Sequence, residues 1–310
     1  MRIITLTLNP AFDVHCHTPH FEPFHENLAE ITDREAGGKG VNISRALTMN
    51  GVENLALVVL GEENGSDFRR ALDADGMKYL EITVPGRIRE NITLHADDSD
   101  ETRISFSGFK ADDSLLDRVK DAILPMADDG CIITFTGRVP SGISMDAVKA
   151  LLCELKARGA KIVIDSRSFS KADLIEMAPW LIKPNQEEIS EYLGIKVETH
   201  EDTLSAAKEL NRLGIENVMI SLGSKGAMLV CSEGAFTATP PKIEAVSTIG
   251  AGDSSIAGFL AAANDGKHAA DMLRCAVAYG SAACMSAGTR PPMPCDVAAV
   301  MGGVAVNEIG

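Results

Sequence analysis

Short apolar runs rich in β-branched residues recur along the chain, and they are separated by segments whose apolar residues return with helical spacing. The apolar runs predict strands at residues 3–8, 55–60, 131–135, 161–164, 181–182, 218–221 and 227–230. The helical spacing predicts helices at 40–49, 66–75, 114–127, 144–158, 203–213 and 254–263. Apolar strands that alternate with amphipathic helices are typical of a mostly parallel sheet with helices on both faces, so the pattern predicts the α/β class.

Two segments do not follow this alternation. Residues 12–35 show little helical periodicity, and residues 87–109 have the pattern of a β-hairpin with an acidic turn. We therefore expect a main α/β domain formed by 1–11, 36–86 and 110–310, and a small discontinuous β lid formed by 12–35 and 87–109. We expect this lid to cover a crevice or to form a dimer surface.

Polar residues and glycines follow most of the predicted strands, among them Asn9, Thr136, Asp165 and Asn185. The carboxyl ends of parallel strands meet at one edge of a sheet, where α/β proteins bind their ligands. Each of these residues is also an ordinary loop residue. The set as a whole favours a ligand site at that edge.

The composition narrows the classes of ligand. The 310 residues include 29 Lys and Arg against 44 Asp and Glu, which gives a net charge of −15. This charge argues against binding to nucleic acid or to an anionic membrane, because both require a basic surface. An anionic small molecule would need positive charge concentrated around its site.

No apolar stretch is long enough to span a membrane. The seven cysteines form no C-x-x-C pair, and we expect reduced, buried thiols and a cytoplasmic location.

The strongest local motif is Gly250-Ala251-Gly252-Asp253, which precedes the predicted helix at 254–263. The glycines allow a tight turn whose N–H groups point to one spot, and the start of a helix adds the positive end of its dipole. The loop therefore predicts an anion site. An aspartate at a helix start is usually a cap, but beside an anion site Asp253 is suited to activate an alcohol as a base.

A second glycine-rich loop, Gly37-Gly38-Lys39-Gly40-Val41-Asn42, also leads into a predicted helix. It matches neither the P-loop pattern nor the dinucleotide-binding pattern. Its glycines alone would indicate only a turn. Lys39 and Asn42 add side-chain donors that suit a polyhydroxylated or phosphorylated ligand.

Two weaker motifs follow later strands. Asn185 and Glu188 lie at a strand-to-helix junction, where this pair is able to hold Mg²⁺ directly or through water. An acidic residue at a helix start is also common without any metal. Ser221, Gly223 and Gly226 belong to a further glycine-rich turn that suits nucleotide phosphates.

These four motifs, in this order, resemble those of the ribokinase-like (PfkB) carbohydrate kinases over essentially the whole chain. Segments 7–13, 178–185 and 246–250 are most similar to the phosphosugar branch, which contains 1-phosphofructokinases and tagatose-6-phosphate kinases. The resemblance implies a ribokinase-like three-layer αβα sandwich with a mostly parallel central sheet and a small β-sheet lid. It also implies an ATP-dependent phosphosugar kinase that uses Mg²⁺.

The resemblance further implies a role for each matching residue. Asp253 would take the proton from the acceptor hydroxymethyl group, and the backbone N–H groups of Gly250, Ala251 and Gly252 would stabilise the charge that develops during transfer. The phosphosugar would be bound by Asp13, Gly37, Gly38, Lys39, Asn42, Arg89, Arg103 and Arg138. ATP would be bound by Asn185, Ser221, Gly223, Gly226 and Thr248, with Mg²⁺ organised by Glu188 directly or through water. The family's lid commonly serves as a dimer clasp, so the resemblance implies a homodimer.

Some positions depart from the family pattern. Ser247-Thr248 replaces the common Asp-Thr, as in the 1-phosphofructokinase-like branch. Arg138 follows Thr136-Gly137 where phosphosugar kinases often read Ser-Gly-Ser, and it is either a bidentate phosphate ligand or a surface residue. Glu90 adds a negative charge to the lid that would be unfavourable beside a phosphate. The identity of the phosphosugar therefore stays open.

Other interpretations are weaker. A non-catalytic sugar-phosphate sensor on the same fold is opposed by the intact candidate base, anion loop and Asn/Glu pair. A nucleoside kinase is disfavoured by the residues at 9–13 and by the available cations. His15, His17 and His20 lie near Cys16, but the spacing of a four-ligand zinc site is absent, so we expect solvated lid histidines.

Overall fold

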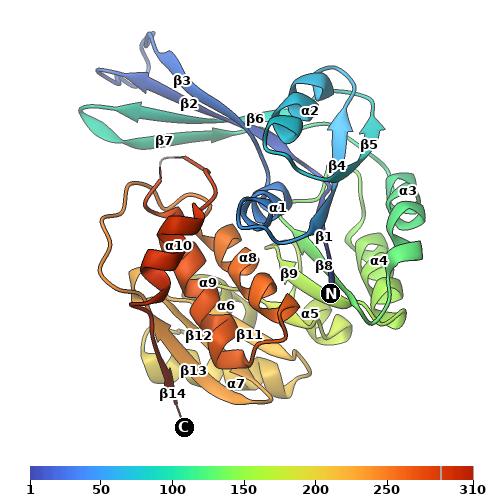
Figure 1. Ribbon diagram of the computed structural model, residues 1–310. Coiled ribbons are helices and arrows are strands. Elements are labelled where there is room, and N and C mark those ends of the chain that lie inside the picture. Colours follow the sequence, from blue (N-terminus) through green and yellow to red (C-terminus); the bar gives the residue numbers. More distant parts are fainter. Residues whose placement is uncertain (287, 310) are drawn as a thin grey trace.

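The computed structural model describes residues 1–286 and 288–309, and it has three layers, with helices on both faces of a large sheet (Figure 1). In the described residues this main sheet has ten strands in the order β14-β13-β12-β11-β10-β9-β8-β1-β4-β5. The neighbours from β11 to β5 pair in parallel, and the neighbours from β11 to β14 pair antiparallel. These strands are β1 (Arg2–Thr7), β4 (Asn54–Gly61), β5 (Tyr79–Val84), β8 (Cys131–Thr136), β9 (Lys161–Asp165), β10 (Leu181–Ile182), β11 (Asn217–Ser221), β12 (Ala227–Cys231), β13 (Gly234–Thr239) and β14 (Ala305–Glu308). The predicted α/β class and mostly parallel sheet are confirmed.

Each face of the main sheet has its own helices and its own apolar core (Figure 1). Successive side chains of a strand point to opposite faces, so Ile3 of β1 lies in one core while Ile4 and Leu6 lie in the other. The core that contains Ile3 includes residues of α1 (Lys39–Met49), α8 (Ala251–Asn264), α9 (Ala269–Ala283) and α10 (Pro294–Met301). The other core includes residues of α2 (Gly65–Ala74), α3 (Ser114–Ile123), α4 (Met145–Ala157), α5 (Lys171–Met177), α6 (Gln186–Leu193) and α7 (His200–Arg212).

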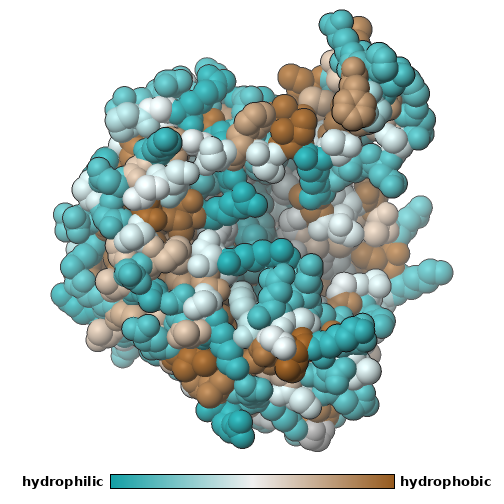
Figure 2. Space-filling view, turned by 180° about the vertical axis from the view of Figure 1, so that it is seen from behind, coloured by the Kyte–Doolittle hydropathy of each residue, from teal (hydrophilic) through white to brown (hydrophobic). Residues whose placement is uncertain are grey.

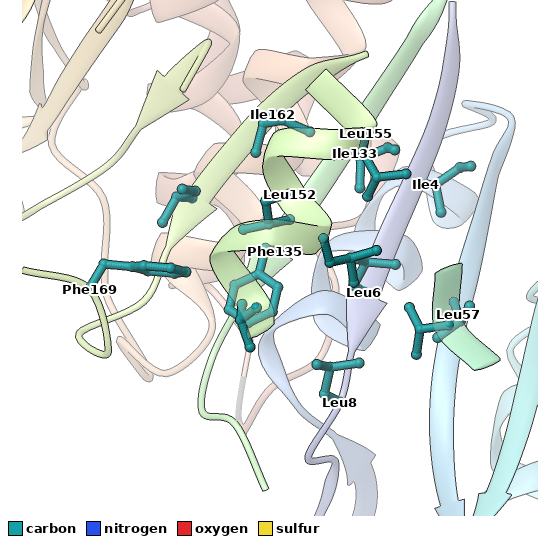
Figure 3. Close-up of a cluster of buried hydrophobic side chains, with 14 of the residues drawn as sticks. Ile4, Leu6, Leu8, Leu57, Ile133, Phe135, Leu152, Leu155, Ile162 and Phe169 are labelled. Carbon is teal, nitrogen blue, oxygen red and sulfur yellow. The ribbon is translucent and has the colours of Figure 1, made fainter. Parts of the chain in front are cut away.

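The centre of the second core is shown in Figure 3. Leu6 of β1 and Phe135 of β8 lie in the same buried cluster as Leu152 of α4, and each of these side chains is 1% exposed. Full burial of such a side chain contributes about 1.5–3 kcal/mol. This packing holds the central strands in place, and their carboxyl ends carry the polar residues described below.

A smaller, separate sheet projects from the main body (Figure 1). Its strands, in the order β3-β2-β6-β7, are β2 (Ala11–Thr18), β3 (Glu30–Gly37), β6 (Arg89–Ala96) and β7 (Ser99–Ser105). Strands β2 and β6 pair in parallel, and the two outer pairs are antiparallel. We call this four-stranded sheet the lid.

Parts of the fold differ from the sequence prediction. The helix expected at 114–127 ends as α3 at Ile123 and continues as a 3-10 turn, Leu124–Met126, that contains Pro125. Sequence analysis also missed β5, β13, β14, α5, α6, α9 and α10.

The predictions drawn from composition have mixed outcomes. All seven cysteines are free thiols, but only Cys131 and Cys231 are buried, so the expectation of buried thiols is wrong for the rest. Across the described residues, none of the helices combines the length and the apolar character that crossing a membrane requires.

Candidate active site

Two cavities open at the edge of the main sheet where the parallel strands end. The first has a volume of about 290 Å³ and lies between the lid and the ends of β1 and β8; we call it the lid cavity. The second has a volume of about 720 Å³ and lies beside β11, β12, α8 and α9; we call it the large cavity. Figure 2 shows a hollow ringed by hydrophilic side chains in the main body, below the projecting lid.

The predicted site residues divide between these cavities. The lid cavity is lined by Asp13, Gly38, Lys39, Asn42, Arg89, Arg103, Arg138, Gly250 and Asp253. The large cavity is lined by Asn185, Ser221, Gly223, Gly226, Thr248, Ala251 and Gly252. Gly37 and Glu188 line neither of the two cavities.

The loop before α8 separates the two cavities. Gly250 is the N-cap of this helix and has a φ of 77°, a left-handed conformation that favours glycine. Ile249, Gly250 and Asp253 line the lid cavity, whereas Thr248, Ala251 and Gly252 line the large cavity. A group that passes from one cavity to the other therefore passes the start of α8, where the helix dipole favours negative charge.

Asp253 lies in the first turn of α8 and is 7% exposed. It is not the helix cap, and its Oδ2 accepts a hydrogen bond of 2.9 Å from Asn42 Nδ2. Burial raises the pKa of Asp253 to about 6; the charge of Lys39 opposes this rise and the charge of Asp165 adds to it. The carboxyl group is therefore ionised at neutral pH and is able to accept a proton from a bound hydroxyl.

Lys39 is the first residue of α1, and its Nζ lies 2.8 Å from Asp165 Oδ2. The helix reaches this position because Gly40 has no side chain. A Cβ on Gly40 would lie 2.4 Å from Thr7 Oγ1 and 2.8 Å from the Leu6 carbonyl oxygen. The second glycine-rich loop therefore packs α1 directly against β1 and brings Lys39 and Asn42 to the lid cavity.

The lid supplies a second set of polar groups. Asp13 Oδ1 accepts a hydrogen bond of 2.9 Å from Asn91 Nδ2, and burial raises the pKa of Asp13. A Cβ on Gly37 would overlap the Asp13 carboxylate, so the role of Gly37 is to leave room for it. The Arg89 guanidinium donates to the carbonyl oxygens of Phe106 and Asn9 at 3.2 and 3.3 Å.

Arg138 and Arg103 are the other cations of the lid cavity. Arg89 and Arg138 both line the lid cavity. Burial lowers the pKa of Arg89, and the nearby charge of Arg138 lowers it further. Arg138 is exposed and forms no ion pair within the described part of the chain. Arg103 pairs with Glu101. The lid cavity thus has positive charge without a protein counter-ion.

Several buried polar atoms around the lid cavity lack a hydrogen-bond partner. Such atoms are uncommon in proteins and indicate an absent water or ligand. They are Thr7 Oγ1, Asn9 Oδ1, Asn42 Oδ1, Arg89 Nε, Asn91 Oδ1 and Thr136 Oγ1. This set of donors and acceptors fits a ligand with several hydroxyl groups.

The large cavity has a different character. Met219, Ala227, Ile243 and Val277 form apolar walls, which suit a flat ring. The turn from Ser221 to Gly226 and the loop before α8 provide backbone and hydroxyl groups at its edge. An apolar slot beside glycine-rich turns is suited to a nucleotide.

Asn185 and Glu188 cap α6 reciprocally. Asn185 Oδ1 accepts from the Glu188 N–H at 2.8 Å, and Glu188 Oε2 accepts from the Asn185 N–H at 3.0 Å. Glu188 Oε1 also accepts from Arg167 Nε at 2.7 Å. Because both carboxylate oxygens already accept hydrogen bonds, Glu188 fits a Mg²⁺ ion held through water better than one held directly.

Glu90, whose negative charge would be unfavourable beside a phosphate, does not line the lid cavity. Alternate residues of β6 point to opposite faces, and Arg89 and Asn91 line the lid cavity whereas Glu90 does not. Glu90 Oε1 instead lies 3.0 Å from Arg34 Nη2. Its negative charge is therefore directed away from the ligand.

The lid histidines have protein partners. His17 bonds Asp97 and His20 bonds Asp98, and His15 Nδ1 lies 3.2 Å from His95 Nε2. His15 is only 7% exposed, so the expectation of a solvated side chain is wrong for this residue. Within residues 1–286 and 288–309, no group of three His, Cys, Asp or Glu residues has the arrangement of a metal site.

Comparison with known proteins identifies the family of the chain. Residues 19–296 match the pfkB family of carbohydrate kinases. The chain belongs to this family. It is 33% identical over 259 residues to 1-phosphofructokinase of Escherichia coli strain K12, covering 84% of this chain and 83% of that protein. It is also 33% identical over 281 residues to 1-phosphofructokinase of Borreliella burgdorferi, covering 90% and 91% of the two chains.

A solved structure has the same fold. Phosphofructokinase-2 from Escherichia coli, in complex with potassium, has a TM-score of 0.92 and 26% identity, covering 97% of this chain and 98% of that one. The three-layer ribokinase-like fold with its separate small sheet is thereby confirmed. As a pfkB family member, the chain is a kinase that transfers a phosphoryl group from ATP to a hydroxyl group.

Several residues that the structure places at the site were given no individual role by sequence reasoning, although Asn9, Thr136 and Asp165 were among the strand-end residues expected at a ligand site. Asn9, Asn91 and Thr136 line the lid cavity, and Lys183 lines the large cavity. Asp165 lies between the two cavities and contacts a lysine from each. Asn9, Thr136, Asp165 and Lys183 come at or just after the end of a buried strand, which is the signal that points to them.

Proposed function

We propose that the protein is a 1-phosphofructokinase, which transfers the γ-phosphoryl group of ATP to the 6-hydroxyl of fructose 1-phosphate. The observation that carries this proposal is the position of Asp253 on the lid-cavity side of a loop whose other side faces the large cavity. This arrangement brings an acceptor hydroxyl and a nucleotide phosphate to the same helix start. The relatives named 1-phosphofructokinase support the choice of substrate.

The reaction is a direct in-line displacement without a covalent enzyme intermediate. The Asp253 carboxylate takes the proton of the 6-hydroxyl, whose oxygen forms a bond to the γ-phosphorus while the bond to the β–γ bridging oxygen breaks. The backbone N–H groups at 250–252 and the dipole of α8 stabilise the charge on the transferred group. Catalysis comes from placing the two reactants in line.

The lid cavity binds the phosphosugar. Asp13, Asn42 and Asn91 supply hydrogen bonds to its hydroxyl groups, and Lys39 lies beside the acceptor. Arg138, Arg89 and Arg103 bind the phosphate that is already on the sugar, and neither Arg138 nor Arg89 forms an ion pair within the described residues.

The large cavity binds ATP, with the adenine against the apolar walls and the phosphates at the turns that contain Ser221, Gly223, Gly226 and Thr248. Asn185 and Glu188 would organise a Mg²⁺ ion through water. When bound, the ion would neutralise charge on the β- and γ-phosphates.

The lid also suits dimerisation, and we propose a homodimer formed through it. Apolar side chains on the lid and its loops are exposed to solvent, which is typical of an interaction surface. They are Phe24, Leu28, Ile31, Ile104 and Phe106.

With ATP and a phosphosugar as its substrates, we place the protein in the cytoplasm.

The proposed function is tested by coupled measurement of ADP release with fructose 1-phosphate, fructose 6-phosphate, tagatose 6-phosphate and nucleosides. We expect the highest kcat/KM with fructose 1-phosphate. A preference for tagatose 6-phosphate would identify a tagatose-6-phosphate kinase, and binding without turnover of any sugar would identify a sensor.

A further inference from the structure

A buried carboxylate, that of Asp165, lies between two lysines that belong to different cavities. Lys39 Nζ is 2.8 Å from Asp165 Oδ2, and Lys183 Nζ is 3.7 Å from Asp165 Oδ1. Lys39 lines the lid cavity and Lys183 lines the large cavity. In the described structure Asp165 lines neither cavity, although it contacts a lysine from both.

The fold holds these three residues in place. Asp165 is the last residue of β9, and Lys183 directly follows the neighbouring strand β10. Lys39 opens α1, whose approach to the sheet depends on Gly40. The Asp165 side chain is 6% exposed and the Lys183 side chain 9% exposed, so solvent screens their interaction weakly.

We call Lys39, Asp165 and Lys183 the bridge, and its two lysines lie close to the groups that would react. A Cβ on Gly252 would lie 3.2 Å from Lys183 Nζ, which places this ammonium against the loop where the phosphoryl group passes. On the other side, burial disfavours the charged form of Lys39, but the charges of Asp165 and Asp253 outweigh this effect and raise its pKa. Burial likewise opposes ionisation of Asp165, yet Lys183 and Lys39 hold its pKa below the usual range. Lys39 and Asp165 are therefore both charged at neutral pH.

We propose that Asp165 is a positioning residue that couples the phosphosugar cavity to the nucleotide cavity through its shared contacts with Lys39 and Lys183. The carboxylate offsets part of the positive charge that each lysine presents to its anionic ligand. Removal of one lysine leaves the carboxylate paired with the other lysine alone, and anion binding at the opposite cavity weakens. This inference rests on the proposed function for the identity of the two ligands.

Asp165→Asn separates positioning from a general structural role. The amide keeps the shape of the side chain but removes its charge, so both lysines present more positive charge to anions. We expect dissociation constants about three- to tenfold lower for fructose 1-phosphate and for ADP in EDTA, each measured alone by calorimetry. We expect kcat to fall about 100-fold, because the lysines lose their fixed positions. Weaker binding of both ligands would overturn the proposal, since a merely distorted site binds both less well.

Single lysine variants give a test that does not depend on folding of the Asp165 variant. Lys183→Gln, which changes the nucleotide cavity, is expected to weaken binding of fructose 1-phosphate about three- to tenfold in the absence of nucleotide. Lys39→Gln is expected to weaken ADP binding by a similar factor in the absence of sugar. Lys242→Gln is the matched control for fructose 1-phosphate binding, because Lys242 lines the same cavity as Lys183 but forms no ion pair with Asp165 in the described structure.

The outcomes are distinguishable from failure of the proposed function. Unchanged fructose 1-phosphate affinity in Lys183→Gln would overturn the coupling, as would a loss of equal size in Lys242→Gln. If the wild-type protein neither binds nor phosphorylates fructose 1-phosphate, the proposed substrate is wrong. The ADP measurements on Asp165→Asn and Lys39→Gln would then still decide whether the bridge exists.

Discussion

Asp253 is a buried acid whose position suits chemistry rather than stability. Its side chain accepts a hydrogen bond from Asn42 and takes no part in capping α8. Burial raises its pKa to about 6, so its ionised form is disfavoured in the folded protein but still predominates at neutral pH. A base with a pKa near the working pH is effective in proton transfer.

Replacing this base is expected to abolish most turnover. For Asp253→Asn we expect kcat to fall about 100- to 10,000-fold, because the amide cannot accept the proton. The ADP dissociation constant should change by less than about threefold. Asp265→Asn, at the exposed end of the same helix, is the control and should retain full activity. Turnover near the wild-type value in Asp253→Asn would contradict the assignment of the base.

The pH profile reports on the same group. Asp253 must be ionised to act, so kcat/KM should be nearly constant above about pH 7 and approach a tenfold fall per pH unit below about pH 5. Steady-state rates with fructose 1-phosphate from pH 5 to 8 check this expectation. An acid limb that lies near pH 4 would show that burial does not control Asp253.

The raised pKa of Asp253 also predicts that the stability of the fold depends on pH. An acid whose pKa is raised on folding stabilises the fold below its ordinary pKa, and this contribution is lost as the pH rises through its folded value near 6. At pH 7.5 the wild-type protein therefore carries a buried charge that Asp253→Asn lacks. We expect the variant to gain about 3 kcal/mol at pH 7.5 and little at pH 4, measured by urea unfolding. An equal gain at both pH values would point to a cause other than ionisation.

Arg138 gives a prediction for substrate binding. Because Arg138 lines the lid cavity with Arg89 and forms no ion pair in the described part of the chain, Arg138→Ala should raise the KM for fructose 1-phosphate about 10- to 100-fold. We expect kcat and the KM for ATP to change little, and Arg70→Ala on the surface of α2 to have no effect. An increase in the KM for ATP instead would place Arg138 outside the phosphosugar site.

At the scale of elements, the central strands were predictable and the peripheral ones were not. Strands β1, β4 and β8 are buried on both faces, which requires continuous apolar runs. Strands β13 and β14 lie at the edge of the sheet and are partly exposed, so they lack such runs. Helix α9 was missed although its amphipathic contrast is similar to that of α1 and α4, which were predicted.

The residues of the site were also predictable only where a local sequence pattern has a direct structural meaning. Asp253, Lys39 and Asn42 were predictable because glycine-rich loops at helix starts have a direct physical meaning. Asp165 was expected only as one of several strand-end residues at the ligand edge, and Lys183 was given no role, because their specific importance comes from contacts between strands that are distant in sequence. The capping box of α5, formed by Ser170 and Asp173, was a signal that sequence analysis overlooked.

The approach of α1 to β1 gives a test at this scale. Gly40→Ala would place a Cβ against the backbone of Leu6, so α1 must shift and carry Lys39 and Asn42 with it. We expect kcat to fall at least about tenfold. Gly302→Ala is the control, because nothing lies within 4 Å of a Cβ there. Normal activity of Gly40→Ala would show that the packing of α1 is not needed to place its first turn.

For the whole molecule, the net charge of −15 coexists with a site for two anions. The attraction is local, since it comes from two helix starts, Lys39, Lys183 and the arginines of the lid cavity. The overall charge describes the outer surface, and it argues against binding to nucleic acid without arguing against small phosphorylated ligands.

Assembly is the other property of the whole molecule. Ile104→Asp on the exposed apolar surface of the lid should convert the proposed dimer to a monomer, because a charge would be buried in the interface. Light scattering after size-exclusion chromatography measures the change, and Ile195→Asp, exposed outside the lid, is the control. A dimer that persists in Ile104→Asp would place the interface elsewhere.

The separation of the two cavities by one loop has a consequence for the order of events. Each proposed substrate has a cavity of its own, so we expect each to bind and leave while the other is bound. Both must nevertheless be present at once, because no residue between them carries the phosphoryl group. Double-reciprocal plots of the initial rate against one substrate, at several fixed concentrations of the other, should therefore intersect. We expect the two substrates to bind in random order.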